Sequence, residues 1–288
     1  MNATIVTAFC PGHISGYFRR IQGESIATTG SIGAGIVISE GVTATVAPAR
    51  SVSIRISRRD DTGRLVPYSR TSPPLEYVLH KLGVNASVTT ECRLPIGAGF
   101  GLSAAALLAT LTAVNESNGL GLFPRDIALL AHEAEVIHRT GLGDVASCQG
   151  GGRVVRSGPG IDAGITRSFD LSEPICAVSF GPIPTPSVLG SHEQMDRVTA
   201  AFPRDPPRDA AEFFRLSRLF AERSGLMTKE AETVIRNCDY RGIPASMTML
   251  GNGVFAYGCG AYDILSPNGT VYTMGVADQG ARIIGGTP

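Results

Sequence analysis

The stretch that decides the fold is Leu94–Gly119, which reads LPIGAGFGLSAAALLATLTAVNESNG. Glycines alternate at positions 97, 99 and 101, and a run of good helix formers begins directly after them, at about Leu102. Glycine permits positive φ angles and leaves no Cβ atom in the way of a ligand. The first turn of a helix has unpaired peptide N–H groups and the positive end of the helix dipole. The stretch therefore predicts an anion site whose natural ligand is a phosphate group.

The first turn of this predicted helix also carries a hydroxyl group, that of Ser103, which can reach a phosphate or its Mg²⁺ ion. Other interpretations stay open. Alternating glycines can simply let a helix pack closely on a strand, and a non-catalytic nucleotide sensor would use the same turn. Gly101–Ala105 (GLSAA) also differs only at its last position from the G-x-S-x-G elbow of serine hydrolases, with Ser103 as nucleophile. A hydrolase needs a later histidine, and His192 is the only one in the C-terminal half.

Three common nucleotide-binding classes do not fit the sequence. A Walker P-loop needs G-K-[ST], but the only lysines, Lys81 and Lys229, do not follow a glycine. Gly30–Gly35 reads G-x-x-G-x-G, and no strand–turn–helix pattern of the Rossmann type surrounds it. The H-R-D and D-F-G motifs of protein kinases are absent. The sequence therefore predicts a phosphate cradle of another kind.

Composition places the chain among globular proteins without affinity for nucleic acid or membranes. Hydrophobic residues make up 43% and charged residues 17% of its 288 residues, and the formal net charge is zero. We see no signal peptide and no apolar run long enough to cross a bilayer. The six cysteines lack C-x-x-C spacing, which argues against zinc and favours free thiols in a reducing compartment. We therefore expect a cytoplasmic protein.

Hydrophobic periodicity and turn residues predict an α+β protein with helices on largely antiparallel sheets. Strands are expected at Thr4–Phe9, Ile36–Ile38, Thr43–Val46, Ser51–Ser57, Ala86–Cys92, Arg153–Arg156, Ile165–Phe169 and Ile175–Phe180. Helices are expected at Pro73–Leu82, Leu102–Asn118, Pro124–His138, Asp209–Arg223 and Thr228–Asn237, with proline-rich breaks at Pro182–Pro186 and Arg204–Arg208 around one more short helix. A domain boundary is expected near residue 165.

Three motifs resemble those of the GHMP kinase superfamily, which includes galactokinase, homoserine kinase and mevalonate kinase. Phe9–Gly16 (FCPGHISG) is similar to the first, Pro95–Ala105 (PIGAGFGLSAA) to the second, and Ser246–Gly258 (SMTMLGNGVFAYG) loosely to the third. The resemblance implies an N-terminal ribosomal-protein-S5-like domain over residues 1–165 and a C-terminal ferredoxin-like α/β sandwich over residues 166–288. It also implies an active site between the two domains and, by analogy, a homodimer.

Within the superfamily, further details are similar to the archaeal pantoate kinases. The pointers are Gly30–Gly35 (GSIGAG) and His138–Val145 (HRTGLGDV), together with the first two motifs. This resemblance implies an ATP- and Mg²⁺-dependent transfer of the γ-phosphate to the 4-hydroxyl of pantoate, a step towards coenzyme A. Mevalonate or homoserine kinase activity is the alternative within the superfamily.

The resemblance also assigns roles to individual residues. Asp144 matches the family's catalytic aspartate and would accept or orient the proton of the acceptor hydroxyl. Mg²⁺ prefers carboxylate and phosphate oxygens, and the family pattern points to Glu135 with Ser103, with Glu133 as the other candidate. The ATP-binding residues would be Pro95, Gly97, Ala98, Gly99, Phe100, Gly101, Leu102, Ser103, Ala104 and Ala105.

The acceptor should be bound by an arginine, because pantoate carries a carboxylate and arginine pairs with carboxylates through two hydrogen bonds. Arg156 is favoured as this residue, and Arg153 is the alternative. Ser31 and His13 are predicted to line the same pocket. His13 stands where mevalonate kinases carry lysine, and Leu102 stands where many relatives have a first serine.

Overall fold

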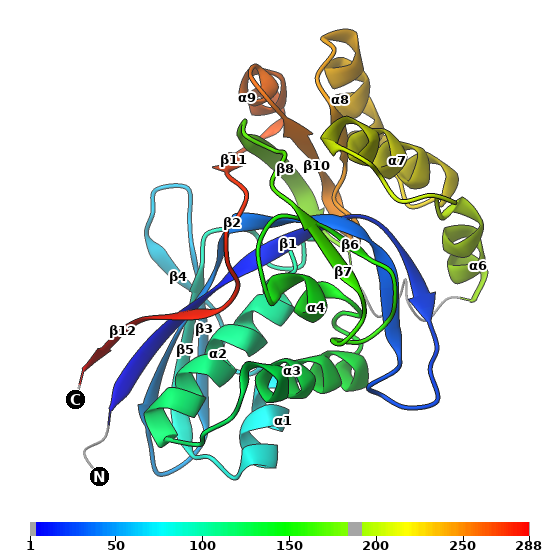
Figure 1. Ribbon diagram of the computed structural model, residues 1–288. Helices are drawn as coiled ribbons and strands as arrows, with labels where there is room; N and C mark the ends of the chain where they lie inside the picture. The colour runs from blue at the N-terminus through cyan, green and yellow to red at the C-terminus, as the bar shows by residue number, and fades with distance from the viewer. Residues whose placement is uncertain (1–3, 184–191, 288) are drawn as a thin grey trace.

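The computed structural model describes residues 4–183 and 192–287. Within these residues the helices pack around two β-sheets (Figure 1). The larger sheet has the order β12-β1-β2-β5-β3-β4, and β6 and β7 extend it from β2. Its strands are β1 (Ile5–Ile21), β2 (Gly30–Pro48), β3 (Ser53–Arg59), β4 (Leu65–Ser69), β5 (Ala86–Cys92), β6 (Arg153–Arg156), β7 (Ile165–Ser168) and β12 (Arg282–Thr287). All of its pairings are antiparallel except that of β3 with β5.

The smaller sheet has the order β11-β8-β10-β9 and is antiparallel throughout. Its strands are β8 (Ile175–Pro182), β9 (Ala245–Met247), β10 (Gly251–Tyr257) and β11 (Val271–Met274). The helices are α1 (Pro73–Leu82), α2 (Leu102–Asn118), α3 (Pro124–His138), α4 (Asp144–Cys148), α6 (His192–Ala201), α7 (Ala210–Arg223), α8 (Lys229–Tyr240) and α9 (Ala261–Leu265). This arrangement confirms the predicted α+β class.

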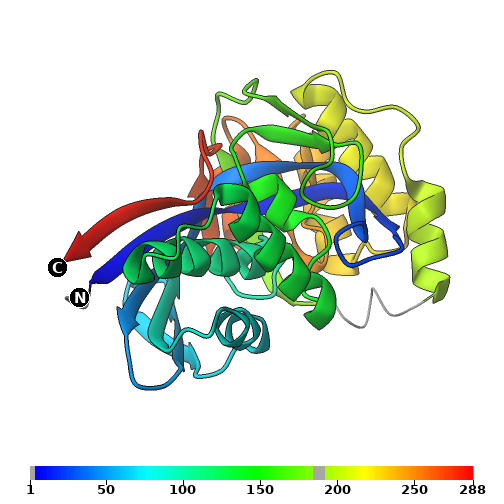
Figure 2. The ribbon, with the colours of Figure 1, turned by 60° about the horizontal axis from the view of Figure 1, so that its bottom comes forward.

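The long helix α2 is the centre of the larger unit. It packs on β1 and β2, and α1, α3 and α4 pack against its other sides (Figure 2). Its apolar residues point in all directions, as expected for a helix that is covered on every side. The helices α7 and α8 cover the smaller sheet, and α7 also contacts β1. Both chain ends lie together, because β12 pairs with β1.

Local signals located several elements correctly. The helices at Pro73–Leu82 and Pro124–His138 and the strand at Ala86–Cys92 have the predicted bounds. Asp209 caps α7 as predicted, since its carboxylate accepts a hydrogen bond of 2.8 Å from the peptide N–H of Glu212. The predicted break at Pro182–Pro186 falls partly outside the described residues.

Other predictions missed the length and number of strands. The strand predicted at Thr4–Phe9 continues to Ile21, because the proline and glycines of the first motif lie in irregular positions of the β1–β2 ladder instead of ending it. The strand β4 was not predicted. The predicted boundary at residue 165 lies at the start of β7, which pairs with β6 of the larger sheet, and β12 returns to that sheet from the C-terminal part. The division at this residue stays a prediction.

Among the described residues, no helix is long and apolar enough to cross a lipid bilayer.

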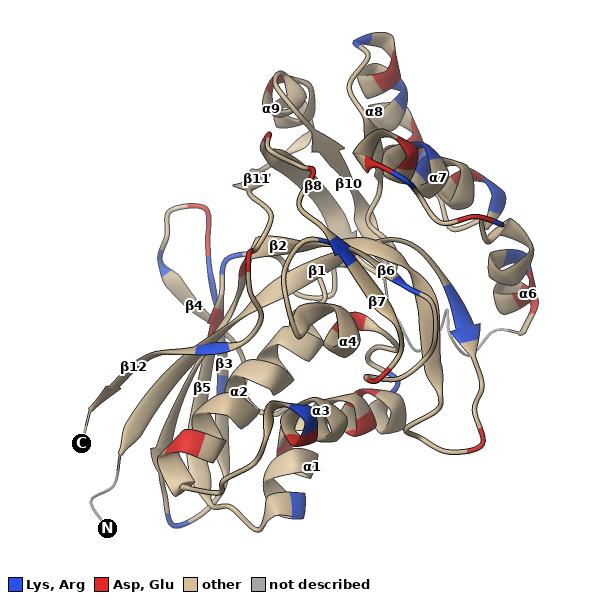
Figure 3. Ribbon diagram, viewed as in Figure 1, with Lys and Arg blue, Asp and Glu red and all other residues tan. Residues whose placement is uncertain are grey.

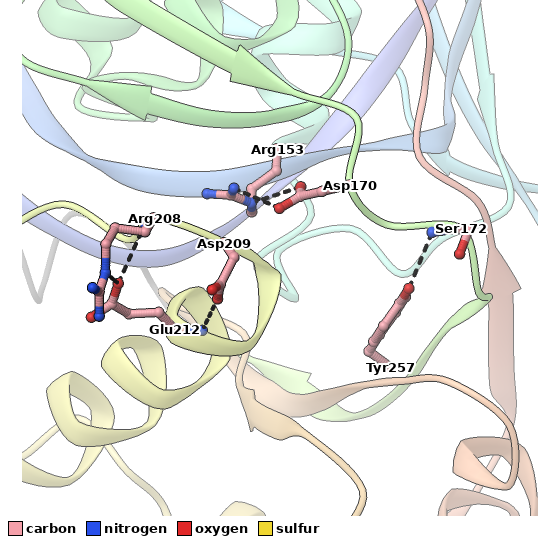
Figure 4. A network of polar contacts seen from close by, with 7 residues as sticks. All are labelled: Arg153, Asp170, Ser172, Arg208, Asp209, Glu212 and Tyr257. Atoms are coloured by element: carbon pink, nitrogen blue, oxygen red, sulfur yellow. Dashed lines mark hydrogen bonds and ion pairs between the residues drawn. The ribbon is translucent and has the colours of Figure 1, made fainter.

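The segment that joins β7 to β8 is attached to both sheets (Figure 4). Asp170 accepts two hydrogen bonds, of 3.0 and 2.7 Å, from the guanidinium of Arg153 on β6 and another from the peptide N–H of Ala210 at the start of α7. Two residues later, the peptide N–H of Ser172 donates to the hydroxyl of Tyr257 on β10 over 3.1 Å. Arg153 is only 2% exposed and Asp170 is 33% exposed, so the pair joins a buried guanidinium to a carboxylate near the surface.

We predict that Asp170→Ala lowers the free energy of unfolding by about 2 kcal/mol, because it leaves the buried guanidinium of Arg153 without its charged partner. Asp162→Ala is the matched control. Asp162 binds Arg125 with the same two-bond geometry, but both side chains are more than 60% exposed, so the loss should stay below about 0.5 kcal/mol. Urea denaturation of both variants measures the two losses in the free energy of unfolding. Equal losses would show that the Arg153–Asp170 pair stabilises the fold no more than the exposed Arg125–Asp162 pair.

Candidate active site

The glycine turn before α2 has the geometry that its sequence predicts. Gly97, Gly99 and Gly101 have φ angles of 79°, 84° and 63°, in the region that only glycine adopts without strain. The helix begins at Leu102, and no side chain caps its first N–H groups. No acidic residue lies in the first turn, and Figure 3 shows no acidic residue at this end of α2. No charge on α2 itself therefore compensates the positive end of this helix.

Close backbone contacts hold this turn between the first and third motifs. The peptide N–H of His13 donates to the carbonyl of Phe100 over 2.9 Å. A Cβ atom on Gly99 would lie 2.7 Å from the carbonyl oxygen of Met249, and one on Gly251 would lie 2.1 Å from the backbone of Ala98. Since ordinary side chains do not fit at these contacts, the glycines are required for the three segments to meet.

A cavity of about 460 Å³ opens over the turn and the start of α2. Seven of the ten predicted ATP-binding residues line it, while Pro95, Ala98 and Ala105 do not. Apolar side chains from β2, β3, β5 and α1 form one side of the cavity, and Pro182, Met249 and Leu250 from the smaller sheet close another. The cavity therefore lies between the two sheets, as the resemblance implied.

Asp144, the first residue of α4, lies at one end of the cavity with 24% of its side chain exposed. Its carboxylate accepts a hydrogen bond of 2.7 Å from Nδ1 of His13. Burial alone would raise the pKa of Asp144, but the hydrogen bond and charge of His13 and the charge of Arg156 outweigh it and lower that pKa. Asp144 is therefore an ionised carboxylate that faces the cavity.

His13 lies behind Asp144 and lines neither this cavity nor the small void beside it. Its side chain is fully buried, and burial lowers its pKa although Asp144 opposes this. Its Nε2 atom has no hydrogen-bond partner and faces Gly35, where a Cβ atom would lie 2.2 Å away. This placement corrects the prediction that His13 lines the substrate pocket, because Asp144 stands between the two.

Glu135 and Ser103 lie together in the cavity, since the hydroxyl of Ser103 hydrogen-bonds to the carboxyl of Glu135. Thr140 donates to the same carboxyl group over 3.1 Å. Burial, helped by the negative charge of Asp144, raises the pKa of Glu135 to about 8. A buried carboxyl group of this kind favours a cation beside it, and the oxygens of Glu135 and Ser103 are the donors that Mg²⁺ prefers.

Glu133 is engaged elsewhere. Its carboxylate accepts hydrogen bonds from Lys81 and from the hydroxyl of Tyr77, at the surface between α1 and α3. Within the described chain, no group of three or more His, Cys, Asp or Glu side chains is placed to hold a metal ion by itself. A metal at Glu135 would therefore need phosphate oxygens and water to complete its ligands.

Arg156 and Ser31 lie on the far side of Asp144. The guanidinium of Arg156 is 3% exposed, donates to the Ser31 hydroxyl over 3.2 Å, and has an Nε atom without a partner. Burial lowers the pKa of Arg156, and the negative charge of Asp144 opposes this shift. A Cβ atom on Gly143 would collide with this guanidinium, so the glycine makes room for it. The alternative residue, Arg153, is saturated by Asp170.

The hydrolase interpretation finds no support in this geometry. Among the described residues, no histidine hydrogen-bonds to Ser103: His13 binds Asp144, and Nε2 of His132 binds the carbonyl of Thr29. The partner of Ser103 is the carboxyl group of Glu135. Thr140 and Leu250 were missed by the sequence reasoning, because only the folded chain brings the 139–143 loop and the β9–β10 turn to the cavity.

Comparisons with known proteins show the family of this chain. The family described as GHMP kinases N terminal domain matches residues 74–152, which include the glycine turn, Glu135 and Asp144. The chain is 46% identical to a pantoate kinase of Methanospirillum hungatei over 286 residues, which are 99% of both chains. It is 31% identical to a pantoate kinase of Thermococcus kodakarensis, over 88% of this chain and 87% of that one.

The fold is shared with a solved structure described as a phosphotransferase related to the CoA biosynthesis pathway. The TM-score is 0.79 at 27% identity, and the match covers 97% of this chain and 98% of the other. Two relatives above 30% identity therefore align with 99% and 88% of this chain. This chain belongs to the GHMP kinases and, within them, to the pantoate kinase family.

Proposed function

We propose that the protein transfers the γ-phosphate of ATP to the 4-hydroxyl of pantoate. The observation that carries this proposal is the position of Asp144, which lies between the uncapped start of α2 and the buried guanidinium of Arg156. One side of the carboxylate offers a site for a triphosphate and the other a site for a small organic anion. Phosphoryl transfer needs the acceptor hydroxyl in line with the γ-phosphorus and an acidic group beside that hydroxyl.

The triphosphate would lie over the glycine turn, with its oxygens accepting hydrogen bonds from the free N–H groups of the first turn of α2. Ser103 and Glu135 would hold Mg²⁺, which supplies neutralisation of phosphate charge when bound. Asp144 would accept the proton of the acceptor hydroxyl as the oxygen attacks the γ-phosphorus. His13 fixes the orientation of this carboxylate from behind, through the hydrogen bond to Oδ1.

Arg156 would bind the carboxylate of the acceptor. Its Nε atom has no hydrogen-bond partner and its guanidinium is buried, with the charge of Asp144 nearby but no carboxylate of the described chain in an ion pair with it. A ligand carboxylate would supply this partner. We further propose that the enzyme works in the cytoplasm, where its free cysteines, five of them buried, stay reduced. The homodimer implied by the resemblance stays a prediction.

We predict that the protein releases ADP from ATP when Mg²⁺ and pantoate are present, and much less with mevalonate or homoserine. Asp144→Asn should lower kcat about a thousandfold, since the proton acceptor is lost, and should leave ATP binding nearly unchanged. A coupled ADP assay measures turnover and calorimetry measures ATP binding. Asp162→Asn, at the surface, is the control. Turnover by Asp144→Asn at the rate of the unmodified protein would exclude this role, and labelling of Ser103 by a fluorophosphonate would support a hydrolase instead.

The raised pKa of Glu135 predicts how stability changes with pH in the absence of Mg²⁺. The pKa of this carboxyl group is about 8 in the folded protein and has its usual, lower value in the unfolded chain. At pH values between the two, the group is protonated in the folded protein and ionised in the unfolded chain. Its contribution to stability is therefore complete at low pH and is lost as the pH rises through about 8. The glutamine in Glu135→Gln stays neutral at every pH. The melting temperature of this variant should therefore rise relative to that of the unmodified protein as the pH increases from about 5 to about 9.

Glu133→Gln is the matched control on the same helix. Burial pushes the pKa of Glu133 up, but the hydrogen bonds from Lys81 and Tyr77 lower it overall. Glu133 is therefore ionised over this whole pH range, and the difference in melting temperature between its variant and the unmodified protein should stay constant. A constant difference for Glu135→Gln as well would show that Glu135 is an ordinary carboxylate.

A further inference from the structure

The space between Asp144 and Arg156 is nearly closed in this structure. A void of about 20 Å³ lies there, bordered by the side chains of Ser15, Ser31 and Leu250 as well. A cavity of this size holds about one water molecule. A six-carbon hydroxy acid is far larger, so part of the wall must move before such an acceptor can reach both Asp144 and Arg156.

Leu250 borders both this void and the phosphate cavity. Three residues line both spaces, namely Ser15, Asp144 and Leu250, and Leu250 is the only apolar one. Its side chain is partly buried and packs against the hydrophobic core. The void therefore has a polar end, formed by the acid and the guanidinium, and an apolar side to which Leu250 contributes.

The backbone of Leu250 is strained. Its φ angle is 62°, in the left-handed region that costs a non-glycine residue about 1–2 kcal/mol. Within the described residues, only Arg139 is another non-glycine residue with positive φ. Backbone strain of this kind is found at functional sites, where the surrounding structure holds a side chain in a position that an unstrained backbone would not give it. Leucine at this position, instead of glycine, indicates that the side chain itself has a function.

The β9–β10 turn that carries Leu250 is fixed from several sides. The peptide N–H of Met249 donates to the carbonyl of Ser15 over 3.4 Å, and that of Gly251 donates to Thr248 over 3.2 Å. The glycine contacts described above press the same turn onto the phosphate-binding loop. The position of Leu250 is therefore coupled both to the first motif and to the loop on which a triphosphate would lie.

We propose that Leu250 is a specificity-determining residue for the acceptor. Its side chain packs against the aliphatic part of the hydroxy acid whose carboxylate Arg156 binds, and it shields from water the passage through which the acceptor hydroxyl reaches the phosphate cavity. The acceptor class is a small branched hydroxy acid, with an anionic end and an apolar body. This inference rests on the proposed function, since it concerns the acceptor of the same phosphoryl transfer.

The test is a comparison of Leu250→Ala and Leu250→Gly with the unmodified protein on a panel of hydroxy acids. Losing the leucine side chain should raise the KM for pantoate about tenfold and leave the KM for ATP within about twofold. The ratio of kcat/KM for a homologue with one more methylene to kcat/KM for pantoate should rise about tenfold. ATP hydrolysis without any acceptor should also increase, because water gains access to the γ-phosphate.

Leu216→Ala is the matched control, since Leu216 on α7 is another partly buried leucine of the core that lines neither cavity. Its acceptor KM and acceptor preference should not change. Leu250→Gly also removes the backbone strain, so a folding defect would not explain its loss of selectivity.

Unchanged acceptor KM and preference in both Leu250 variants would overturn the role of Leu250 while leaving the proposed function intact. If the unmodified protein instead shows no pantoate-dependent ADP release, the proposed function fails, whatever the variants do. A rise in the KM for ATP with an unchanged KM for pantoate would show that Leu250 shapes the nucleotide site and not the acceptor site.

Discussion

The whole site depends on one unsatisfied end of a helix. The first N–H groups of α2 have no side-chain cap, and the glycine turn before them lets no side chain cover them. These peptide groups border the cavity, where an anion could accept their hydrogen bonds. The first and third motifs press against the turn through contacts that only glycine permits, which fixes the uncapped end relative to both sheets.

Around this end, the charged groups are arranged so that Asp144 is surrounded by partners with different tasks. His13 supports the carboxylate from the interior, Arg156 provides positive charge on the acceptor side, and the Glu135 carboxyl group stands towards the phosphate cavity. Burial is the main cause of the raised pKa of Glu135, and the charge of Asp144 adds to it, whereas the hydrogen bond and charge of His13 and the charge of Arg156 lower the pKa of Asp144. A cation between them and a triphosphate would allow both to be ionised.

The glycine turn, α2 and α3 could be predicted from the sequence because glycine geometry, helix propensity and proline at a first turn act locally. The placement of His13 could not, because its hydrogen bond to Asp144 joins residues 131 positions apart. Only the first part of β1 could be predicted, as Thr4–Phe9, since the proline and glycines that follow are tolerated only where the ladder is irregular. Leu250 gave no signal, as its positive φ angle and its place between two cavities arise from tertiary contacts.

A crystal structure with Mg²⁺ and a non-hydrolysable ATP analogue tests the central claim most directly. The β- and γ-phosphates should lie over Gly97–Ala104, with their oxygens within hydrogen-bonding distance of the peptide nitrogens at the start of α2. Phosphates bound elsewhere, while side chains of the protein itself occupy those nitrogens, would contradict the assignment of this turn as the triphosphate site.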